Sequence, residues 1–480
     1  MYVSQKVRRA IIMSVTAGSL TIVPTFCPIT NTNLLMSTVS IVHAEIKTYT
    51  GTGRYIMSDF ENQNIAQQRA IDRAIKNAKQ QAGVYLQSYS RLINGNLTND
   101  EIFTITNNIV EVLETNCVPQ PFEQDGEAGL MYTATVRVNI DTDGVRAWIN
   151  RDAQDKSTLI NQNNAARQTS DANDRQVEDL RKRAQNVTTN AERAEIRAAY
   201  QQADNEFLAN QKLEEGNQLY YKGDYNGAIA KYNEALTLYP NGGGIYHNRG
   251  AAYDALKKYE LAIADSTKAI ELNPNEASYY YNRGYIYSDL QQYELAINDY
   301  TKAIQLNQRY FEAYNNRGEL YRKLNNHKKA MTDYNKAIAI NPKYEIAYNN
   351  LGIAYNDLGK YSEAIANYTK AIELNPNLAE AYNNRGVAYK HLQQYELAIE
   401  DYNKAIALNS NYAIAYNNRG NAYAELKNYA AAVADYTKAI ELNPNYVKAY
   451  LSRGFIYYSI GDNARAEADF TKARALGYNN

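Results

Sequence analysis

The second half of the chain repeats one hydrophobic pattern. Along residues 345–378, apolar or small residues recur at spacings of three and four in two stretches: Tyr348, Leu351, Gly352 and Tyr355, then Ala364, Ile365, Tyr368, Ala371 and Ile372. This spacing predicts two amphipathic helices. Residues 358–360 interrupt the pattern between them, and residues 375–377 close the unit with turn-forming residues. The unit is therefore predicted to be a helix–turn–helix pair.

The unit recurs eight times at a fixed interval of 34 residues. A glycine marks the eighth position of each copy, at Gly216, Gly250, Gly284, Gly318, Gly352, Gly386, Gly420 and Gly454. Such a period is typical of a solenoid, because one unit cannot bury its own apolar face and must stack on its neighbours. Residues 209–480 are therefore predicted to form an all-α solenoid, a fold that offers a long surface to a binding partner.

The unit resembles the tetratricopeptide repeat (TPR). It has an aromatic residue at position 4, glycine at 8, tyrosine at 11, alanine at 20, an aromatic residue at 24, alanine at 27 and proline at 32. Among the departures are Ser266 at position 24, and Gln308, Ser410 and Tyr478 at position 32. The resemblance implies a superhelix of eight helix–turn–helix repeats whose first helices line a concave groove.

Two charged positions change together among the copies. Position 7 is arginine and position 23 is aspartate in six of the eight repeats: Arg249 with Asp265, Arg283 with Asp299, Arg317 with Asp333, Arg385 with Asp401, Arg419 with Asp435, and Arg453 with Asp469. Repeat five instead has Leu351 with Asn367, and repeat one reverses the charges with Glu215 and Lys231. This covariation predicts an ion pair between the two helices of a repeat. A partly exposed pair contributes about 0–1 kcal/mol, so its expected role is to fix helix register.

Asparagine occupies position 6 in six consecutive repeats. These residues are Asn248, Asn282, Asn316, Asn350, Asn384 and Asn418. In TPR arrays this position faces the groove, and the series is similar to the asparagine ladder that binds peptide backbone in O-linked N-acetylglucosamine transferases. An amide suits this task because it offers both a donor and an acceptor. The alternative is that asparagine is simply a favoured solvated residue there.

A second mode of TPR recognition, the carboxylate clamp, does not fit the groove positions. It needs lysine and arginine among positions 2, 5, 6 and 9, which here hold mainly Asn, Ala, Ile, Val, Tyr and Glu.

Residues 45–150 are predicted to form a small α+β domain. Residues 48–57 and 130–140 alternate like half-buried strands, and residues 109–113 are a candidate third strand. Between them lies a predicted helix with a ridge of small side chains at Ala66, Ala70, Ala74, Ala78 and Ala82, which is suited to packing on a sheet. The strand–helix–strand order and the closing TVRVNIDTDG resemble the N-terminal domain of flagellar assembly protein T and small outer-membrane lipoproteins.

Residues 151–208 are predicted to be a charged helical linker. The segment contains no proline or glycine, and Val177, Leu180, Ala184 and Val187 keep helical spacing. One long helix that runs into the first repeat is expected, rather than a flexible linker.

Residues 1–44 have the pattern of an export signal. Lys6, Arg8 and Arg9 precede an apolar run over residues 10–23, and Val-His-Ala at 42–44 offers a small-residue cleavage site. An uncleaved membrane anchor is the alternative, because residues 34–42 add a second apolar stretch. After cleavage only Cys117 remains, so no internal disulfide is expected. The expected location is the periplasm or cell surface of a bacterium.

Composition and motifs argue against nucleic-acid binding and catalysis. The net charge is −1, from 51 basic and 52 acidic residues without a basic stripe. The four histidines lack metal-ligand spacing, and no Walker loop, GxSxG sequence or catalytic carboxylate pair appears. The glycines of Gly51-Thr52-Gly53 lie within a predicted strand, without a helix start to hold a phosphate. No enzyme activity, cofactor or metal is therefore expected.

These observations favour an exported, non-enzymatic scaffold that binds an extended protein segment, with cell-envelope assembly as the expected setting. One alternative is a structural envelope protein that self-associates through its repeats. Another is a glycosyltransferase-like enzyme, which the last repeat argues against: its polar Asn463, Glu467 and Arg474 suggest a capping repeat at the end of the chain. The scaffold is expected to be a monomer.

Overall fold

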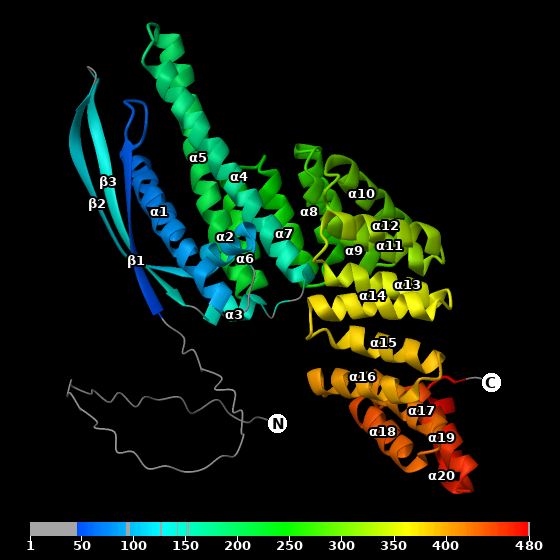
Figure 1. The fold of residues 1–480 in the computed structure, drawn as a ribbon. Helices are drawn as coiled ribbons and strands as arrows, with labels where there is room; N and C mark the ends of the chain where they lie inside the picture. The colour runs from blue at the N-terminus through cyan, green and yellow to red at the C-terminus, as the bar shows by residue number, and fades with distance from the viewer. Residues whose placement is uncertain are drawn as a thin grey trace, which may run out of the picture. The chain divides into compact units, whose positions relative to one another are not determined.

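The computed structural model describes residues 46–92, 97–124, 127–141, 143–149, 151 and 153–478. The expected signal peptide at 1–44 lies outside these residues. Over the described residues, the fold is an array of helix pairs preceded by a small three-stranded sheet and its covering helices (Figure 1). The predicted fold class, a helical solenoid that follows a small α+β unit, is confirmed.

The sheet contains three antiparallel strands in the order β1-β3-β2. They are β1 (Ile46–Ile56), β2 (Val110–Gln124) and β3 (Glu127–Asp141). The register of β1 against β3 runs from Ile46 opposite Asp141 to Ile56 opposite Met131. β2 is much longer than the predicted residues 109–113, and most of its outer side chains are exposed. Hydrogen bonding to β3 therefore extends this strand beyond its apolar start.

Helix α1 (Gln63–Leu92) packs on this sheet through its ridge of small side chains. All five alanines of the ridge are fully buried. A Cβ added at Gly53 would lie 2.4 Å from the backbone oxygen of Ala70, and one at Gly51 would lie 2.1 Å from that of Ala74. The glycines of β1 therefore let helix and strand approach closely. Two shorter helices complete this region, α2 (Asn99–Ile109) and α3 (Asp143–Ile149).

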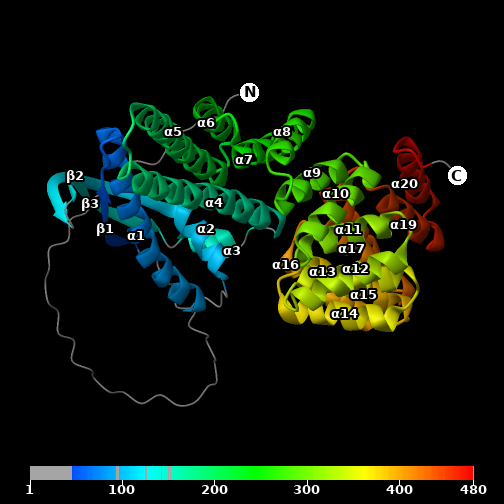
Figure 2. The same cartoon turned by 90° about the horizontal axis from the view of Figure 1, so that it is seen from above.

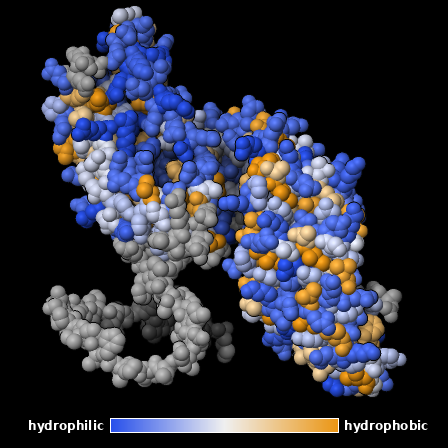
Figure 3. All heavy atoms as spheres, in the orientation of Figure 1, coloured by the Kyte–Doolittle hydropathy of each residue, from blue (hydrophilic) through white to orange (hydrophobic). Residues whose placement is uncertain are grey.

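Residues 153–221 form two helices rather than one. They are α4 (Ala153–Ala184) and α5 (Asn190–Tyr221), which pack side by side, and α5 continues into the first repeat as expected. The break precedes a capping box in which Thr189 accepts from the Glu192 backbone N–H while the Glu192 carboxylate accepts from that of Thr189. Where α4 ends and α5 begins, the face seen in Figure 3 is mostly hydrophilic. Along the array, apolar and polar residues are mixed on the same face.

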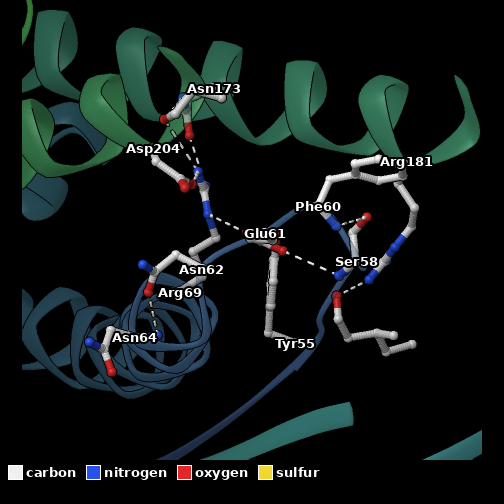
Figure 4. A network of polar contacts seen from close by, with 12 residues as sticks. Tyr55, Ser58, Phe60, Glu61, Asn62, Asn64, Arg69, Asn173, Arg181 and Asp204 are labelled. Atoms are coloured by element: carbon white, nitrogen blue, oxygen red, sulfur yellow. Dashed lines mark hydrogen bonds and ion pairs between the residues drawn. The ribbon is translucent and has the colours of Figure 1, made fainter. Parts of the chain in front are cut away.

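A buried arginine ties both of these helices to α1 (Figure 4). Arg69 on α1 is 2% exposed, and its Nε lies 3.1 Å from Oε1 of Glu61. Its guanidinium also donates to Oδ1 of Asn173 on α4 at 2.8 Å and pairs with Asp204 on α5 at 3.4 Å. The Tyr55 hydroxyl of β1 donates to the same Glu61 carboxylate at 2.6 Å. The hairpin of α4 and α5 is therefore packed against the α+β region, not extended away from it.

Eight helix pairs make up the array (Figure 2). The end of α5 pairs with α6 (Tyr225–Leu238); then follow α7 (Gly243–Ala255) with α8 (Tyr259–Leu272), α9 (Ala277–Asp289) with α10 (Tyr293–Leu306), α11 (Phe311–Lys323) with α12 (His327–Ile340), α13 (Glu345–Asp357) with α14 (Tyr361–Leu374), α15 (Ala379–His391) with α16 (Tyr395–Leu408), α17 (Ala413–Glu425) with α18 (Tyr429–Leu442), and α19 (Val447–Ser459) with α20 (Asn463–Ala475). Each helix packs on its partner and on the next pair.

In every repeat except repeat two, which has Ser266 there, the glycine at position 8 meets the aromatic ring at position 24. In repeat five, a Cβ added at Gly352 would lie 2.6 Å from Cε1 of Tyr368. The turn at position 15 has a positive φ in every repeat, which glycine supplies at Gly359 (φ 72°) and glutamine supplies at Gln291 (φ 58°). The left-handed conformation costs a side chain such as that of Gln291 about 1 kcal/mol.

Candidate functional site

The position-6 asparagines lie on the first helix of each repeat, where they face the repeat before. Five of them pair with the side chain 35 residues earlier: Asn282 Nδ2 with His247 Nε2 at 3.2 Å, Asn316 with the Tyr281 hydroxyl at 3.0 Å, Asn350 with Asn315 Oδ1 at 3.0 Å, Asn384 with Asn349 Oδ1 at 3.2 Å, and Asn418 with Asn383 Oδ1 at 2.9 Å. The side chains thus form a row of hydrogen bonds between neighbouring repeats.

These asparagines are not the exposed residues that the sequence suggested. Asn316, Asn350, Asn384 and Asn418 are half-buried, and Asn282 is 9% exposed. The sequence-based expectation of exposure was wrong because the first helix of the preceding repeat covers part of each side chain. An amide has two N–H groups and a carbonyl oxygen. Each half-buried amide uses one N–H between repeats, and the carbonyl oxygens of Asn316 and Asn384 also accept from Asn315 and Asn383. The second N–H of each amide therefore remains for another molecule.

Asn248 differs from the others because part of the same chain covers it. It is fully buried, and its Nδ2 lies 2.8 Å from Oδ1 of Asn217 and 3.3 Å from the backbone oxygen of Gln162 on α4. Asn217 Nδ2 lies 3.4 Å from the same backbone oxygen. On α4, Asn161 also donates to the Tyr310 hydroxyl at 3.2 Å. Helix α4 therefore occupies the side of the first repeats that carries these amides.

The arginines and aspartates predicted to pair do so in all six repeats. Each arginine uses Nε and one terminal nitrogen to bind both carboxylate oxygens at 2.6–2.9 Å, in the pairs Arg249–Asp265, Arg283–Asp299, Arg317–Asp333, Arg385–Asp401, Arg419–Asp435 and Arg453–Asp469. The arginine side chains are 15–19% exposed and the aspartates 6–9%. Two hydrogen bonds in a mostly buried place make these pairs stronger than surface ion pairs.

Each of these arginines also reaches the repeat before its own, a contact that the sequence did not predict. The remaining terminal nitrogen donates to the threonine or asparagine at position 25 of the preceding repeat at 2.6–3.0 Å, as in Arg317 to Thr301. Tyrosine rings at positions 4 and 11 flank the guanidinium at 5.3–6.0 Å. The arginine therefore joins three helices.

The two exceptional repeats also follow the covariation. In repeat one, Lys231 Nζ lies 2.9 Å from Oε2 of Glu215, so the reversed charges still meet. In repeat five, Leu351 is 4% exposed, and Asn367 donates to the Glu363 backbone oxygen of its own helix. Leu351 lies in a buried cluster with Ala330 and Tyr334 of the preceding repeat, so the two positions of repeat five carry no ion pair.

Two cavities lie beside the first helices of repeats two to four. We name them the repeat-two cavity, of about 380 Å³, and the repeat-four cavity, of about 270 Å³. Asp254 lines the first; burial, with a smaller effect of Asp289, raises the pKa of its carboxyl to about 6. Glu312 lines the second, and burial raises its pKa to about 7. Sequence reasoning missed both carboxylates; Ser266 was the one visible signal near the first.

The described residues contain no group of three or more His, Cys, Asp or Glu side chains placed to hold a metal ion. Within the same part of the chain, no helix is long and apolar enough to cross a membrane.

Models of the TPR family match most of the array. One, described as TPR repeat, matches residues 216–257, 284–325 and 354–393. Two described as tetratricopeptide repeat match residues 245–276, 311–344, 379–412 and 413–446, and residues 267–298, 333–366 and 435–468. Together the matches run without a gap from 216 to 468, which is more than half of the chain.

Several solved structures are similar to parts of the chain. The crystal structure of MamA is 31% identical over 33% of this chain and 93% of MamA, with a TM-score of 0.31. YrrB, described as a TPR protein with an unusual peptide-binding site, is 27% identical over 38% of this chain and 95% of YrrB, with a TM-score of 0.32. A tetratricopeptide repeat protein from Parabacteroides merdae is 24% identical over 56% of this chain and 94% of its own, with a TM-score of 0.38. No curated protein gives a significant match. Because the period, the helix pairs and the family models agree, the chain belongs to the tetratricopeptide repeat family.

Proposed function

We propose that this protein is an exported, non-enzymatic scaffold that holds an extended protein segment along the first helices of its repeats. TPR arrays are protein-interaction scaffolds, and the row of half-buried amides at Asn316, Asn350, Asn384 and Asn418 offers neutral donors and acceptors at regular intervals. Neutral amides suit peptide backbone, which presents the same two kinds of group in any sequence. The bound segment is therefore recognised mainly by its backbone.

The observation that carries this proposal is the contact of Asn248 and Asn217 with Gln162. Two amides of the array both donate to one backbone carbonyl oxygen, at 3.3 and 3.4 Å. The protein thus already uses one side chain of this row, Asn248, together with Asn217 at position 9, to bind backbone of its own chain. The N–H groups of Asn248 in repeat two are already used by contacts that include α4. The bound segment is therefore expected to lie along repeat three and the repeats after it.

The test separates the groove from the stability of the array. The variant Asn350→Ala/Asn384→Ala/Asn418→Ala removes three amides together with three hydrogen bonds between repeats. The matched control, Asn315→Ala/Asn349→Ala/Asn383→Ala, removes the same hydrogen bonds from their buried ends and leaves the position-6 amides in place. It also removes the bonds that Asn315 and Asn383 donate to the carbonyl oxygens of Asn316 and Asn384, so it disturbs the contacts between these helices at least as much as the first variant.

The ligand is the segment recovered by cross-linking from the native envelope fraction, and affinity is measured by calorimetry. Each amide–backbone bond contributes about 0.5–1.5 kcal/mol, so the first triple variant should bind roughly 10- to 2,000-fold more weakly. The control should bind nearly as tightly as the parent. Equal losses in both triple variants would mean that the amides act only between repeats.

Export is proposed from residues 1–44 alone, with the basic start and small-residue site described above. N-terminal sequencing of the protein recovered from the envelope fraction tests it. A mature chain that begins near Glu45 is expected. A chain that keeps residues 1–44 in that fraction would favour the membrane anchor, and recovery from the cytoplasm alone would refute export.

A further inference from the structure

Repeat two lacks the ring that fills the centre of every other repeat. Position 24 is aromatic elsewhere, at Tyr232, Tyr300, Tyr334, Tyr368, Tyr402, Tyr436 and Phe470. In repeat one, the Tyr232 hydroxyl donates to Asn217 at position 9, whereas repeat two has Ser266 and Ala251 at these two positions. Both small residues line the repeat-two cavity. The exchange of a ring for a hydroxymethyl group therefore leaves space beside α7 and α9.

Two acceptor oxygens in this cavity lack a hydrogen-bond partner among the described residues. They are Oδ1 of Asp254 and Oδ1 of Asn282, and Asn282 as a residue is only 9% exposed. The Nδ2 of Asn282 pairs with His247 Nε2 at 3.2 Å, which leaves its carbonyl oxygen unused. Burial lowers the pKa of His247 to about 4, so its ring is neutral and can accept this hydrogen bond. Buried polar atoms are rarely left unpaired, so these two oxygens are available to a donor that enters the cavity.

The remaining lining suits a positive charge. The rings of Tyr220, Tyr225 and Tyr285 border the cavity, and no lysine or arginine is among its lining residues. Aromatic faces attract ammonium groups through the ring quadrupole. Asp289 adds a second carboxylate whose charge is felt at Asp254, where it raises the pKa of that carboxyl. The electrostatic surroundings therefore favour a cation over an anion or a neutral group.

We propose that the repeat-two cavity binds an alkylammonium group, which a lysine side chain of the bound segment supplies. An ammonium has three N–H donors and no acceptor, which matches the unpaired oxygens of Asp254 and Asn282. At about 380 Å³ the cavity is at the small end of ligand pockets, as one side chain requires. The lysine source rests on the proposed function; the ammonium chemistry does not.

The test uses the full chain with n-butylammonium as probe and n-butanol as its neutral counterpart, titrated by saturation-transfer NMR. Asp254→Asn removes the charge, and Ser266→Tyr restores the ring that other repeats carry and fills the space. Glu425→Gln, an exposed carboxylate on the first helix of repeat seven, is the matched control. Circular dichroism establishes that each variant keeps its helix content.

The ammonium site is supported if butylammonium binds the parent and Glu425→Gln equally well and binds both cavity variants at least tenfold more weakly. Butanol should also bind the parent at least tenfold more weakly than butylammonium does. Equal binding of butanol, unchanged binding in Ser266→Tyr, or no saturable binding in the millimolar range would overturn it.

Two peptides then identify the source of the ammonium: Gly-Gly-Lys-Gly-Gly and the same peptide with norleucine. Tighter binding of the lysine peptide than of butylammonium and of the norleucine peptide supports a lysine on a bound segment. Equal binding of butylammonium and the lysine peptide overturns that source and identifies a free-amine site. The proposed function would fail independently of the ammonium site if no cross-linked segment binds the array while butylammonium still binds the cavity.

Discussion

The ion pair of repeat four can be tested by converting it to the uncharged pair, leucine with asparagine, that repeat five already contains. Arg317→Leu leaves Asp333, only 6% exposed, without its two charge-assisted hydrogen bonds of 2.8 Å. Removing one partner of a buried pair costs about 3–5 kcal/mol. Because the arginine is 15% exposed and water can reach its edge, we expect a loss near the lower end, about 3 kcal/mol.

The double variant Arg317→Leu/Asp333→Asn recreates Leu351 and Asn367, a pair that the chain tolerates. It leaves no buried unpaired charge, so we expect a loss of only about 1 kcal/mol against the parent. The assay is chemical denaturation of the full chain followed by circular dichroism, with Asp333→Asn alone completing the cycle. A coupling energy of about 2 kcal/mol or more is expected. If the double variant loses as much stability as the two single variants together, the pair does not stabilise the repeat.

Three further outcomes follow from the fold. Gln291→Gly should raise the free energy of unfolding by about 0.5–1 kcal/mol, because glycine adopts a positive φ without strain; Gly359→Gln should do the reverse, and equal effects would contradict the argument. The pKa of Glu312 is raised to about 7 from an ordinary 4.5, so stability should fall as the pH rises from 4.5 to 7, by at most about 3 kcal/mol. Glu312→Gln should abolish that fall in denaturation at several pH values. Arg69→Ala should cost about 3–5 kcal/mol, because it leaves Glu61 and Asp204 unpaired in a buried place; hydrogen exchange in α4 should rise, and unchanged exchange would show that the hairpin is held by other contacts.

Repetition made the array predictable, because eight copies act as an alignment within one chain. The glycine at position 8 and the pairing of Arg317 with Asp333 follow from comparing copies. The bond from Arg317 to Thr301 does not, because it joins different repeats and position 25 does not covary with position 7. The partial burial of the position-6 asparagines was missed for the same reason.

Contacts between distant parts of the chain were also beyond prediction. The contact between Gln162 and Asn248 depends on where α4 packs. The sequence around either residue does not predict that packing. The start of α5 was detectable, since Thr189 and Glu192 have the spacing of a capping box. The repeat-two cavity needed both the small Ser266 and its neighbours Asp254 and Asn282, which come together only in three dimensions.

The arginine bridges also determine where the array is easiest to pull apart. An arginine links each repeat to the one before it from repeat two to repeat eight, except at the joint between repeats four and five, where Leu351 has no polar group to offer. That joint instead has Arg322 with Asp357, at 3.0 Å and 23% and 31% exposed. Because salt screens exposed charges more than buried ones, the joint between repeats four and five should loosen before the other joints as ionic strength rises. Under mechanical load the solenoid would then extend as two blocks of four repeats, hinged at its midpoint.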